Sequence, residues 1–355
     1  MPPTCEPLGP HNKLIFAPGL LVGHMLSSTD RISIGAKSPL TGGVKEANAG
    51  GRTGMHMATL GIKALIIEGA PAGKELWVLR LSLQGAAWEK ATGLSGLSVY
   101  ETAQRLVECY GEKVAISLIG LGGEMKMLSA GIQNLDKDKV PSRIAARGGL
   151  GAVMACKGLK AIVFDNAGGQ KPPLLHPDDF KQAQKEFTAA LLAHPQTALY
   201  RDYGTRAMPQ MTQHFGALPT RNFSAGTFEQ VDAISGETMR DLLLKRDGAS
   251  ATTHACMAGC SIRCSNVFGG EDGKSIVSPP EYETVGLIGS NLGIGDLDTI
   301  ARLNWQAKLS LGAQLNMAGY DALGACIFAG FGYASAPQVI PALASLPKMT
   351  ACRNT

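Results

Sequence analysis

Short apolar, β-branched runs alternate with glycine- and proline-rich turns through the first half of the chain, a pattern typical of strands. A helix is also predicted over residues 100–110, because Thr102, Leu106 and Cys109 fall on one side of it. Residues 1–167 are therefore predicted to form one β-rich unit. The predicted strands cover residues 13–17, 31–34, 64–68, 76–83, 114–119 and 161–164.

The pattern becomes helical after a glycine- and proline-rich stretch at 165–173, which is typical of a linker. A helix is predicted to begin near Pro177, with Asp178 and Asp179 in its first turn, and to end at Pro195. Two further helices are predicted from about 235 to 245 and from about 296 to 309. The sequence thus predicts an α+β fold. A β-rich domain over 1–167 precedes a mainly helical domain over 168–316 and a fragment of a third domain over 317–355.

Charge and composition narrow the functional classes. The formal net charge of +4 is spread thinly over 355 residues without a Lys/Arg block, so no nucleic-acid partner is expected. No apolar run approaches the roughly 20 residues that a membrane-spanning helix needs, so no membrane partner is expected either. The first residues lack the basic and apolar segments of a secretory signal, and a cytoplasmic protein is expected.

Three of the eight cysteines, Cys256, Cys260 and Cys264, fall within nine residues. In a large chain without a secretory signal, such clustering favours metal binding over disulfides. An iron–sulfur cluster is the first hypothesis, because a [4Fe–4S] cluster is usually held by four thiolates. Zinc also takes four Cys or His ligands and remains an alternative, as do small buried residues on a helix. Spacing does not choose a fourth ligand among Cys5, Cys109, Cys156, Cys326 and Cys352.

About ten short segments, in a fixed order around the cysteine triplet, carry a family resemblance. No single segment decides it, but the ordered set resembles the aldehyde:ferredoxin oxidoreductase family over almost the whole chain. The segments are residues 6–17, 37–42, 48–51, 61–69, 147–154, 157–163, 218–223, 280–283, 289–293 and 321–326.

The resemblance implies an N-terminal β domain that forms a base for the cofactor, followed by two mainly helical domains. Two pterins would hold one tungsten, or molybdenum in some relatives, with no protein side chain bound to the metal. A [4Fe–4S] cluster would lie beside it. Such an enzyme oxidises a small aldehyde to a carboxylic acid and passes electrons through the cluster to ferredoxin or another small electron carrier. The resemblance leaves a homodimer open.

The resemblance also assigns site residues, each with a physical reason. Arginine offers forked donors to phosphate, and glycine lets backbone N–H groups approach it. Glu283 matches a glutamate near the metal and is expected to be a general base. Cys326 becomes the fourth cluster ligand, and Ile144 and Ala146 would contribute backbone atoms only. The expected pterin-binding residues are Arg31, a loop at Asn48, Ala49, Gly50 and Gly51, a second loop at Arg143, Ile144 and Ala146, and finally Asp321 and Ala325.

The chain departs from the family pattern in several places. About sixty N-terminal residues of the family are missing, and residues 310–316 run almost directly into Asp321, where the family has a long stretch with a catalytic histidine. The cysteines follow Cys-x3-Cys-x3-Cys instead of Cys-x2-Cys-x3-Cys, and Ala301 and Asn304 replace a Glu-x-x-His pair. A non-catalytic iron–sulfur electron-transfer subunit or an inactive fragment is therefore the alternative hypothesis.

Overall fold

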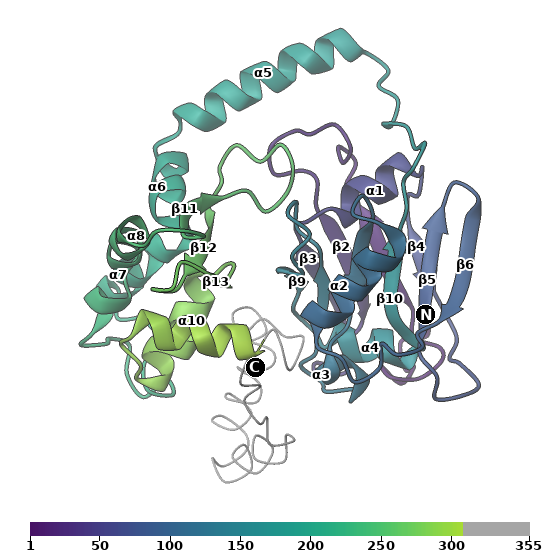
Figure 1. The fold of residues 1–355 in the computed structure, drawn as a ribbon, viewed down its shortest axis with the longest axis horizontal. Helices are drawn as coiled ribbons and strands as arrows, with labels where there is room; N and C mark the ends of the chain where they lie inside the picture. The colour runs from purple at the N-terminus through teal and green to yellow at the C-terminus, as the bar shows by residue number, and fades with distance from the viewer. Residues whose placement is uncertain (308–355) are drawn as a thin grey trace.

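The computed structural model describes residues 1–307, which form two units. The first unit (residues 1–166) contains two sheets, and the second unit (residues 177–307) is mainly helical. The units lie side by side, and helix α5 (Pro177–Ala193) runs across the top from one to the other (Figure 1). The stretch that precedes α5 contains no helix or strand between 165 and 176, in line with the predicted linker.

The first sheet has four antiparallel strands in the order β3-β2-β1-β4. Three were predicted: β1 (Leu14–Pro18), β2 (Ile32–Lys37) and β4 (Leu65–Ile67). The fourth, β3 (Val44–Ala49), was not predicted, and it pairs with β2 over all six residues. The sequence predicted a loop at residues 48–51, but Asn48 and Ala49 are the last two residues of β3. Only Gly50 and Gly51 lie beyond the strand.

The second sheet has six strands in the order β6-β5-β10-β7-β8-β9. Its central strand β10 is buried at every position, because it has neighbours on both edges and packing on both faces. Predictions for β5, β7 and β10 are confirmed, whereas β6, β8 and β9 were missed. The strands are β5 (Trp77–Ser82), β6 (Gly85–Lys90), β7 (Ala115–Leu118), β8 (Ile132–Asn134), β9 (Arg143–Ala145) and β10 (Leu159–Phe164).

The two sheets share one apolar core with α1 (Thr53–Thr59) and α4 (Leu150–Cys156). Phe16 and Ile34 of the first sheet and Phe164 of the second are fully buried there. The predicted helix α2 (Val99–Tyr110) covers the other face of the second sheet and begins with a capping box between Ser98 and Glu101. A short helix, α3 (Leu121–Glu124), completes the first unit.

The second unit is mainly helical, but it also contains a small sheet that the sequence did not predict. The sheet, β11-β12-β13, flanks the cysteine triplet and consists of β11 (Ala251–His254), β12 (Ser265–Gly269) and β13 (Ser275–Val277). The longer helices are α6 (Pro195–Tyr203), α7 (Met208–His214), α8 (Gly236–Lys245) and α10 (Leu297–Gln306). Short turns are η1 (Gly204–Ala207), η2 (Val231–Ile234), α9 (Tyr282–Thr284), η3 (Val285–Gly289) and η4 (Ser290–Leu292).

The helix starts follow from local chemistry. Ser235 and Asp296 cap α8 and α10 by accepting hydrogen bonds from the backbone N–H groups of Thr238 and Thr299. Pro195 was predicted to end a helix, and it does separate α5 from α6, where it takes the first helical position. The predicted α+β class is confirmed. Within residues 1–307 no helix is both long enough and apolar enough to cross a membrane.

Candidate functional site

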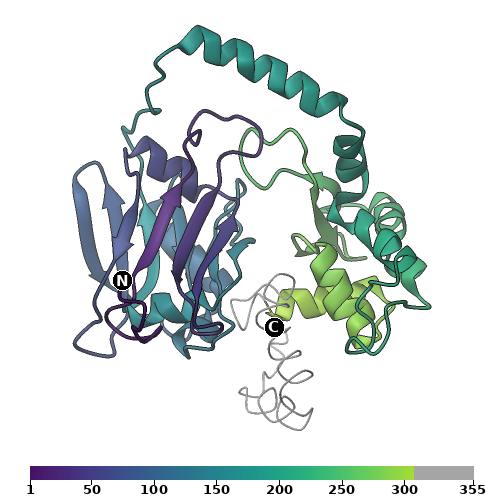
Figure 2. The same cartoon turned by 180° about the vertical axis from the view of Figure 1, so that it is seen from behind.

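The cysteine loop (residues 255–264) connects β11 to β12 and packs against the first unit. The backbone N–H of Ser261 donates to Ser27 Oγ at 2.9 Å, and Ser28 Oγ lies 4.0 Å from Cys260 Sγ. Gly259 adopts φ +75°, and a Cβ built there would lie 2.7 Å from the Met25 carbonyl oxygen. Figures 1 and 2 show this loop against the segment between β1 and β2 from both sides. The loop therefore belongs to the second unit but is held by the first.

The three thiols differ in their readiness to ionise. A hydrogen bond from Cys256 lowers the pKa of Cys260 to about 5, so this thiol is a thiolate at neutral pH. The same hydrogen bond, followed by burial, raises the pKa of Cys256. Burial, with the charge of Glu281, raises the pKa of Cys264 to about 11. Because thiolates are the metal-binding form, Cys260 is the member best prepared to bind a metal.

The structure brings the first predicted cofactor residues to the cysteine loop. A Cβ built on Gly50 would lie 3.3 Å from Cys256 Sγ, so glycine lets the two units approach closely at this point. Arg31 Nε donates to Asn48 Oδ1, and Asn48 Nδ2 donates to Ser33 Oγ at 3.1 Å. The positive charge of Arg31 also opposes the rise in the pKa of Cys256. Arg31, Asn48 and Gly50 are therefore neighbours beside Cys256.

Gly51 has a different role from Gly50. Its φ of +104° is a conformation that L side chains rarely adopt, and a Cβ there would lie 2.5 Å from the Leu135 carbonyl oxygen. The next residue, Arg52, donates its backbone N–H to the same oxygen at 2.9 Å. Gly51 thus fixes the path of the backbone between the two sheets.

Arg143 is the second arginine at the cysteine loop, and it lies on strand β9 instead of the predicted loop. Only 7% of its surface is exposed. Its guanidinium donates to Ser265 Oγ and His254 Nδ1, both at 3.0 Å, and its charge opposes the rise in the pKa values of Cys256 and Cys264. Its Nε has no hydrogen-bond partner within residues 1–307. Ile144 lies on the same strand, Ala146 follows it, and both are buried.

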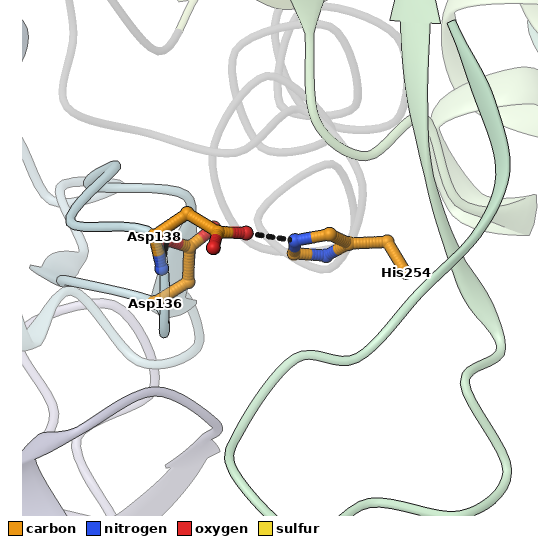
Figure 3. Close-up of side chains that lie close together, drawn as sticks. All are labelled: Asp136, Asp138 and His254. Carbon is orange, nitrogen blue, oxygen red and sulfur yellow. Dashed lines mark hydrogen bonds and ion pairs between the residues drawn. The ribbon is translucent and has the colours of Figure 1, made fainter.

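Asp136, Asp138 and His254 form a cluster that the sequence did not predict, and all three offer ligand atoms within 4.8 Å of one another (Figure 3). The ring proton of neutral His254 belongs on Nε2, because Arg143 donates to Nδ1; Nε2 then donates to Asp138 Oδ2 at 2.7 Å. Asp136 already accepts hydrogen bonds from two backbone N–H groups and from Ser142 Oγ. These contacts indicate a hydrogen-bonded link between the two units and leave no lone pair for a cation on the imidazole.

Glu283, the predicted base, lies half-buried in α9. Burial raises the pKa of its carboxyl group, the nearby Glu281 adds to the rise, and Arg147 opposes it. Thr205 fixes the segment, because its hydroxyl donates to Glu281 Oε2 at 2.6 Å and accepts from the Tyr282 N–H at 3.0 Å. The half-buried carboxyl group therefore binds its proton more readily than an exposed glutamate does.

The remaining predicted residues, Asp321, Ala325 and Cys326, lie outside the described residues, as does the predicted domain over 317–355. The sequence analysis missed Ser27 and His254 as partners of the cysteine loop and its flanking strand. No local signal marks Ser27, whereas His254 stands two residues before Cys256 and could have been considered as a support of the loop.

Comparison with known proteins extends these observations. The family model for the N-terminal domain of aldehyde ferredoxin oxidoreductase matches residues 1–166, and the model for its domains 2 and 3 matches residues 182–312. A tungsten-containing aldehyde ferredoxin oxidoreductase of Pyrococcus abyssi is 35% identical over 307 residues, which cover 86% of this chain and 48% of the relative. The chain therefore spans about half the length of the curated relatives it matches.

Two further proteins match this chain at lower sequence identity. The WOR-like subunit of an aliphatic sulfonate oxidoreductase from Pyrococcus furiosus is 26% identical over 318 residues, which cover 84% of this chain and 48% of the relative. The structure of the active-site complex BamBC of benzoyl coenzyme A reductase, with 1,5-dienoyl-CoA, shares the fold, with a TM-score of 0.70 and 23% identity. That match covers 88% of this chain and 47% of the other. Because the two family models together span most of the sequence, this chain belongs to the aldehyde ferredoxin oxidoreductase family.

Proposed function

We propose that this chain acts in the oxidation of an aldehyde to a carboxylic acid, with a tungsten–bis-pterin cofactor and a [4Fe–4S] cluster that passes electrons to ferredoxin or another small carrier. The observation that carries the proposal is the approach of Gly50 and Arg31 to Cys256. Residues assigned to two different cofactors, from segments more than 200 positions apart, lie together at one place between the two units.

The residues beside the cysteine loop fit a pterin with phosphate groups. Arg31 and Arg143 supply forked, permanently charged donors, and the Nε of Arg143 is a donor without a partner in the described part of the chain. Gly50, whose missing side chain faces Cys256, lets the backbone come close to a group bound at this place. Ile144 and Ala146 are buried, which suits a contribution through the backbone.

We propose that Cys256, Cys260 and Cys264 bind an iron–sulfur cluster, with Cys326 as the fourth ligand. Thiolates are the form that binds iron, and Cys260, with a pKa of about 5, is the thiol of the three that ionises most readily. Four thiolates also bind zinc, so the metal content of the chain distinguishes the two ions.

Glu283 is the proposed general base. Oxidation of an aldehyde hydrate releases two electrons and two protons, and the pterin-bound metal accepts the electrons when it is present. The Glu283 carboxylate takes up a proton from the hydrate or from water, and the pKa raised by burial brings this group closer to neutral pH. Thr205 supports this role, because it fixes the two residues that precede Glu283.

The relatives favour an aldehyde as substrate. The matches named as aldehyde oxidoreductases reach 35% identity, whereas the aliphatic sulfonate oxidoreductase reaches 26%. The same likeness supports tungsten and ferredoxin as cofactor metal and partner. A non-catalytic iron–sulfur electron-transfer protein is the second candidate, because closely spaced cysteines can bind an iron–sulfur cluster without a pterin.

Metal analysis of the anaerobically purified chain, together with an assay of aldehyde oxidation by dye reduction, tests the proposal. Tungsten or molybdenum with about four iron atoms per chain, and an active preparation, are the expected results. Iron alone, without activity, overturns the enzyme and supports the electron-transfer protein. Zinc alone overturns both.

The Glu283→Gln variant tests the base. We expect the rate of aldehyde oxidation to fall by about 10²- to 10⁴-fold, because the amide cannot accept the proton. The control is Glu271→Gln, which removes an exposed carboxylate from the same unit and should leave the rate unchanged. Metal content should be the same in all three proteins. An unchanged rate in Glu283→Gln would remove this residue from the mechanism.

A further inference from the structure

Arg206 is a fully buried charge that no sequence motif marks. It lies in η1 with 1% of its surface exposed, and it is the bulkiest of the fully buried side chains. Its guanidinium makes one long hydrogen bond, from Nη1 to the Pro280 carbonyl oxygen at 3.4 Å. Its Nε has no hydrogen-bond partner and no carboxylate lies within ion-pair distance, as far as residues 1–307 show.

Such an environment is unfavourable for a cation. A buried charge is normally compensated by an ion pair and a full set of hydrogen bonds. Burial lowers the pKa of Arg206 to about 10, and the charges of Glu281 and Cys264 oppose this fall. The guanidinium therefore remains charged at neutral pH. Its compensation has to come from negative charge nearby.

The Cys264 end of the cysteine loop lies close to this charge. A Cβ built on Gly204 would be 2.5 Å from the Cys264 carbonyl oxygen and 2.8 Å from Arg206 Nη2. Glycine at this position therefore leaves room for the guanidinium and the Cys264 backbone to lie near each other. Cys264 is also, after Glu281, one of the two charges that act on the pKa of Arg206.

We propose that Arg206 is the counter-charge of the cysteine loop, and that it stabilises the negative charge of an iron–sulfur cluster bound through Cys264 and so raises its reduction potential. The inference rests on the proposed function, because it needs the cluster. Arg206 is a positioning residue, since it acts on the cluster through Cys264 and through the field of its charge. Thiolates and sulfides make a cluster anionic, and a nearby cation in a low-dielectric site favours the reduced form.

The turn that contains Arg206 also supports the proposed base. Arg206 donates to Pro280, and Thr205 binds Glu281 and Tyr282, so one turn contacts both the cysteine loop and the segment that carries Glu283. A change in Arg206 that acted only through structure would therefore disturb Glu283 as well. A change that acted through charge would alter the potential of the cluster and leave the Thr205 contacts in place.

The test is a redox titration of chains loaded anaerobically with iron and sulfide. Electron paramagnetic resonance monitors the reduction of the cluster. In Arg206→Met we expect reduction of the cluster to become at least tenfold less favourable, which is a shift of 59 mV to more negative potential for one electron. In Arg206→Lys, which keeps the charge, the shift should be smaller. The matched control is Arg201→Met, which removes an exposed arginine from the neighbouring helix α6 and should leave the potential unchanged.

The outcomes separate this inference from the proposed function. An Arg206→Met chain that binds iron with an unchanged potential overturns the counter-charge and leaves the proposed function intact. Should Arg206→Met fail to fold, Arg206→Gln decides, because its neutral amide removes the charge but can still donate a hydrogen bond, and an unchanged potential would again overturn the inference. A wild-type chain that takes up no iron overturns the proposed function and this inference with it.

Discussion

Each unit buries one cation almost completely, and the two cations, Lys160 and Arg206, differ in how their charge is compensated. In the first unit, buried Lys160 has an ion pair with Glu124 and donates to the Leu97 carbonyl oxygen at 3.3 Å. Thr53, Ser117 and Asn134 form a buried hydrogen-bond network in the same unit. In the second unit, Arg206 is buried with one long hydrogen bond, and Ser261 of the cysteine loop donates its backbone N–H to Ser27 of the first unit.

This contrast indicates that the two units have different structural roles. The first unit is complete in itself, because both of its sheets are formed by strands within residues 14–164. The second unit has its own apolar core, but its cysteine loop lies outside that core and depends on Ser27, Gly50 and Arg143. Under the proposed function, the first unit would act as a base for the cofactor and the second would supply the thiolate ligands. Three experiments test this difference between the units.

The largest effect is expected from Cys260→Ala. Removing the thiolate whose pKa is about 5 should reduce bound iron from about four atoms to less than one per chain after anaerobic reconstitution. The unfolding of the first unit, followed by circular dichroism, should not change. Cys109→Ala, which removes an exposed thiol from α2, is the control and should retain iron. Full iron content in Cys260→Ala would show that this cysteine is not a ligand.

A smaller effect is expected from pH in the first unit. Burial lowers the pKa of His56 from 6.5 to about 4, although a hydrogen bond from Nδ1 to the Phe164 carbonyl oxygen opposes this fall. Between these values the unfolded chain binds a proton that the folded chain does not. The contribution of His56 to the free energy of unfolding should therefore be largest above pH 6.5. It should decline by up to about 3 kcal/mol as the pH falls to about 4.

Urea unfolding of wild type and His56→Gln across this range measures the effect. The glutamine amide can still donate to Phe164 but does not titrate, so the difference between the two proteins isolates the contribution of His56 from that of the carboxylates. The slope of stability against pH should be shallower in the variant. Identical slopes would show that His56 is not responsible.

The smallest effect is expected at the contact between the units. In Ser27→Ala the Ser261 N–H loses its acceptor, which costs about 1 kcal/mol and should make loss of iron to a chelator about fivefold more favourable. The stability of the first unit should be unaffected. Ser82→Ala, at the end of β5, is the control, because Ser82 Oγ likewise accepts a backbone N–H, that of Gln84. Equal iron retention in the two variants would contradict the dependence of the cysteine loop on the first unit.

Much of the fold could be predicted, and the exceptions have a common cause. The β-branched runs predicted β1, β2, β4, β5, β7 and β10. Strands β3 and β6 were missed because Val-Lys-Glu-Ala-Asn-Ala and Gly-Ala-Ala-Trp-Glu-Lys have little intrinsic preference for a strand. They are strands because each pairs along its length with a strand that does have this preference.

The site, like the fold, could be predicted only in part, because some of its residues matter through tertiary contacts. Closely spaced cysteines are visible in any sequence, and the family resemblance supplied Arg31, Asn48, Gly50, Arg143 and Glu283. Ser27 and Arg206 are ordinary residues in polar segments, and their importance comes from a tertiary approach that no local pattern encodes. Gly204, which has a φ of +66°, leaves space for both the Cys264 carbonyl oxygen and the Arg206 guanidinium, and this need is not visible in the sequence.

The place of β10 in the six-stranded sheet has a consequence for how the protein is made. This central strand is the last strand of its sheet in the sequence. The sheet therefore cannot form completely until residues up to Phe164 have been translated. From then on the first unit needs nothing from the second, and N-terminal domains generally fold first during synthesis. The surface that carries Ser27 and Gly50 is thus expected to fold before Cys256 is translated. The cysteine loop would then dock onto a first unit that is already folded.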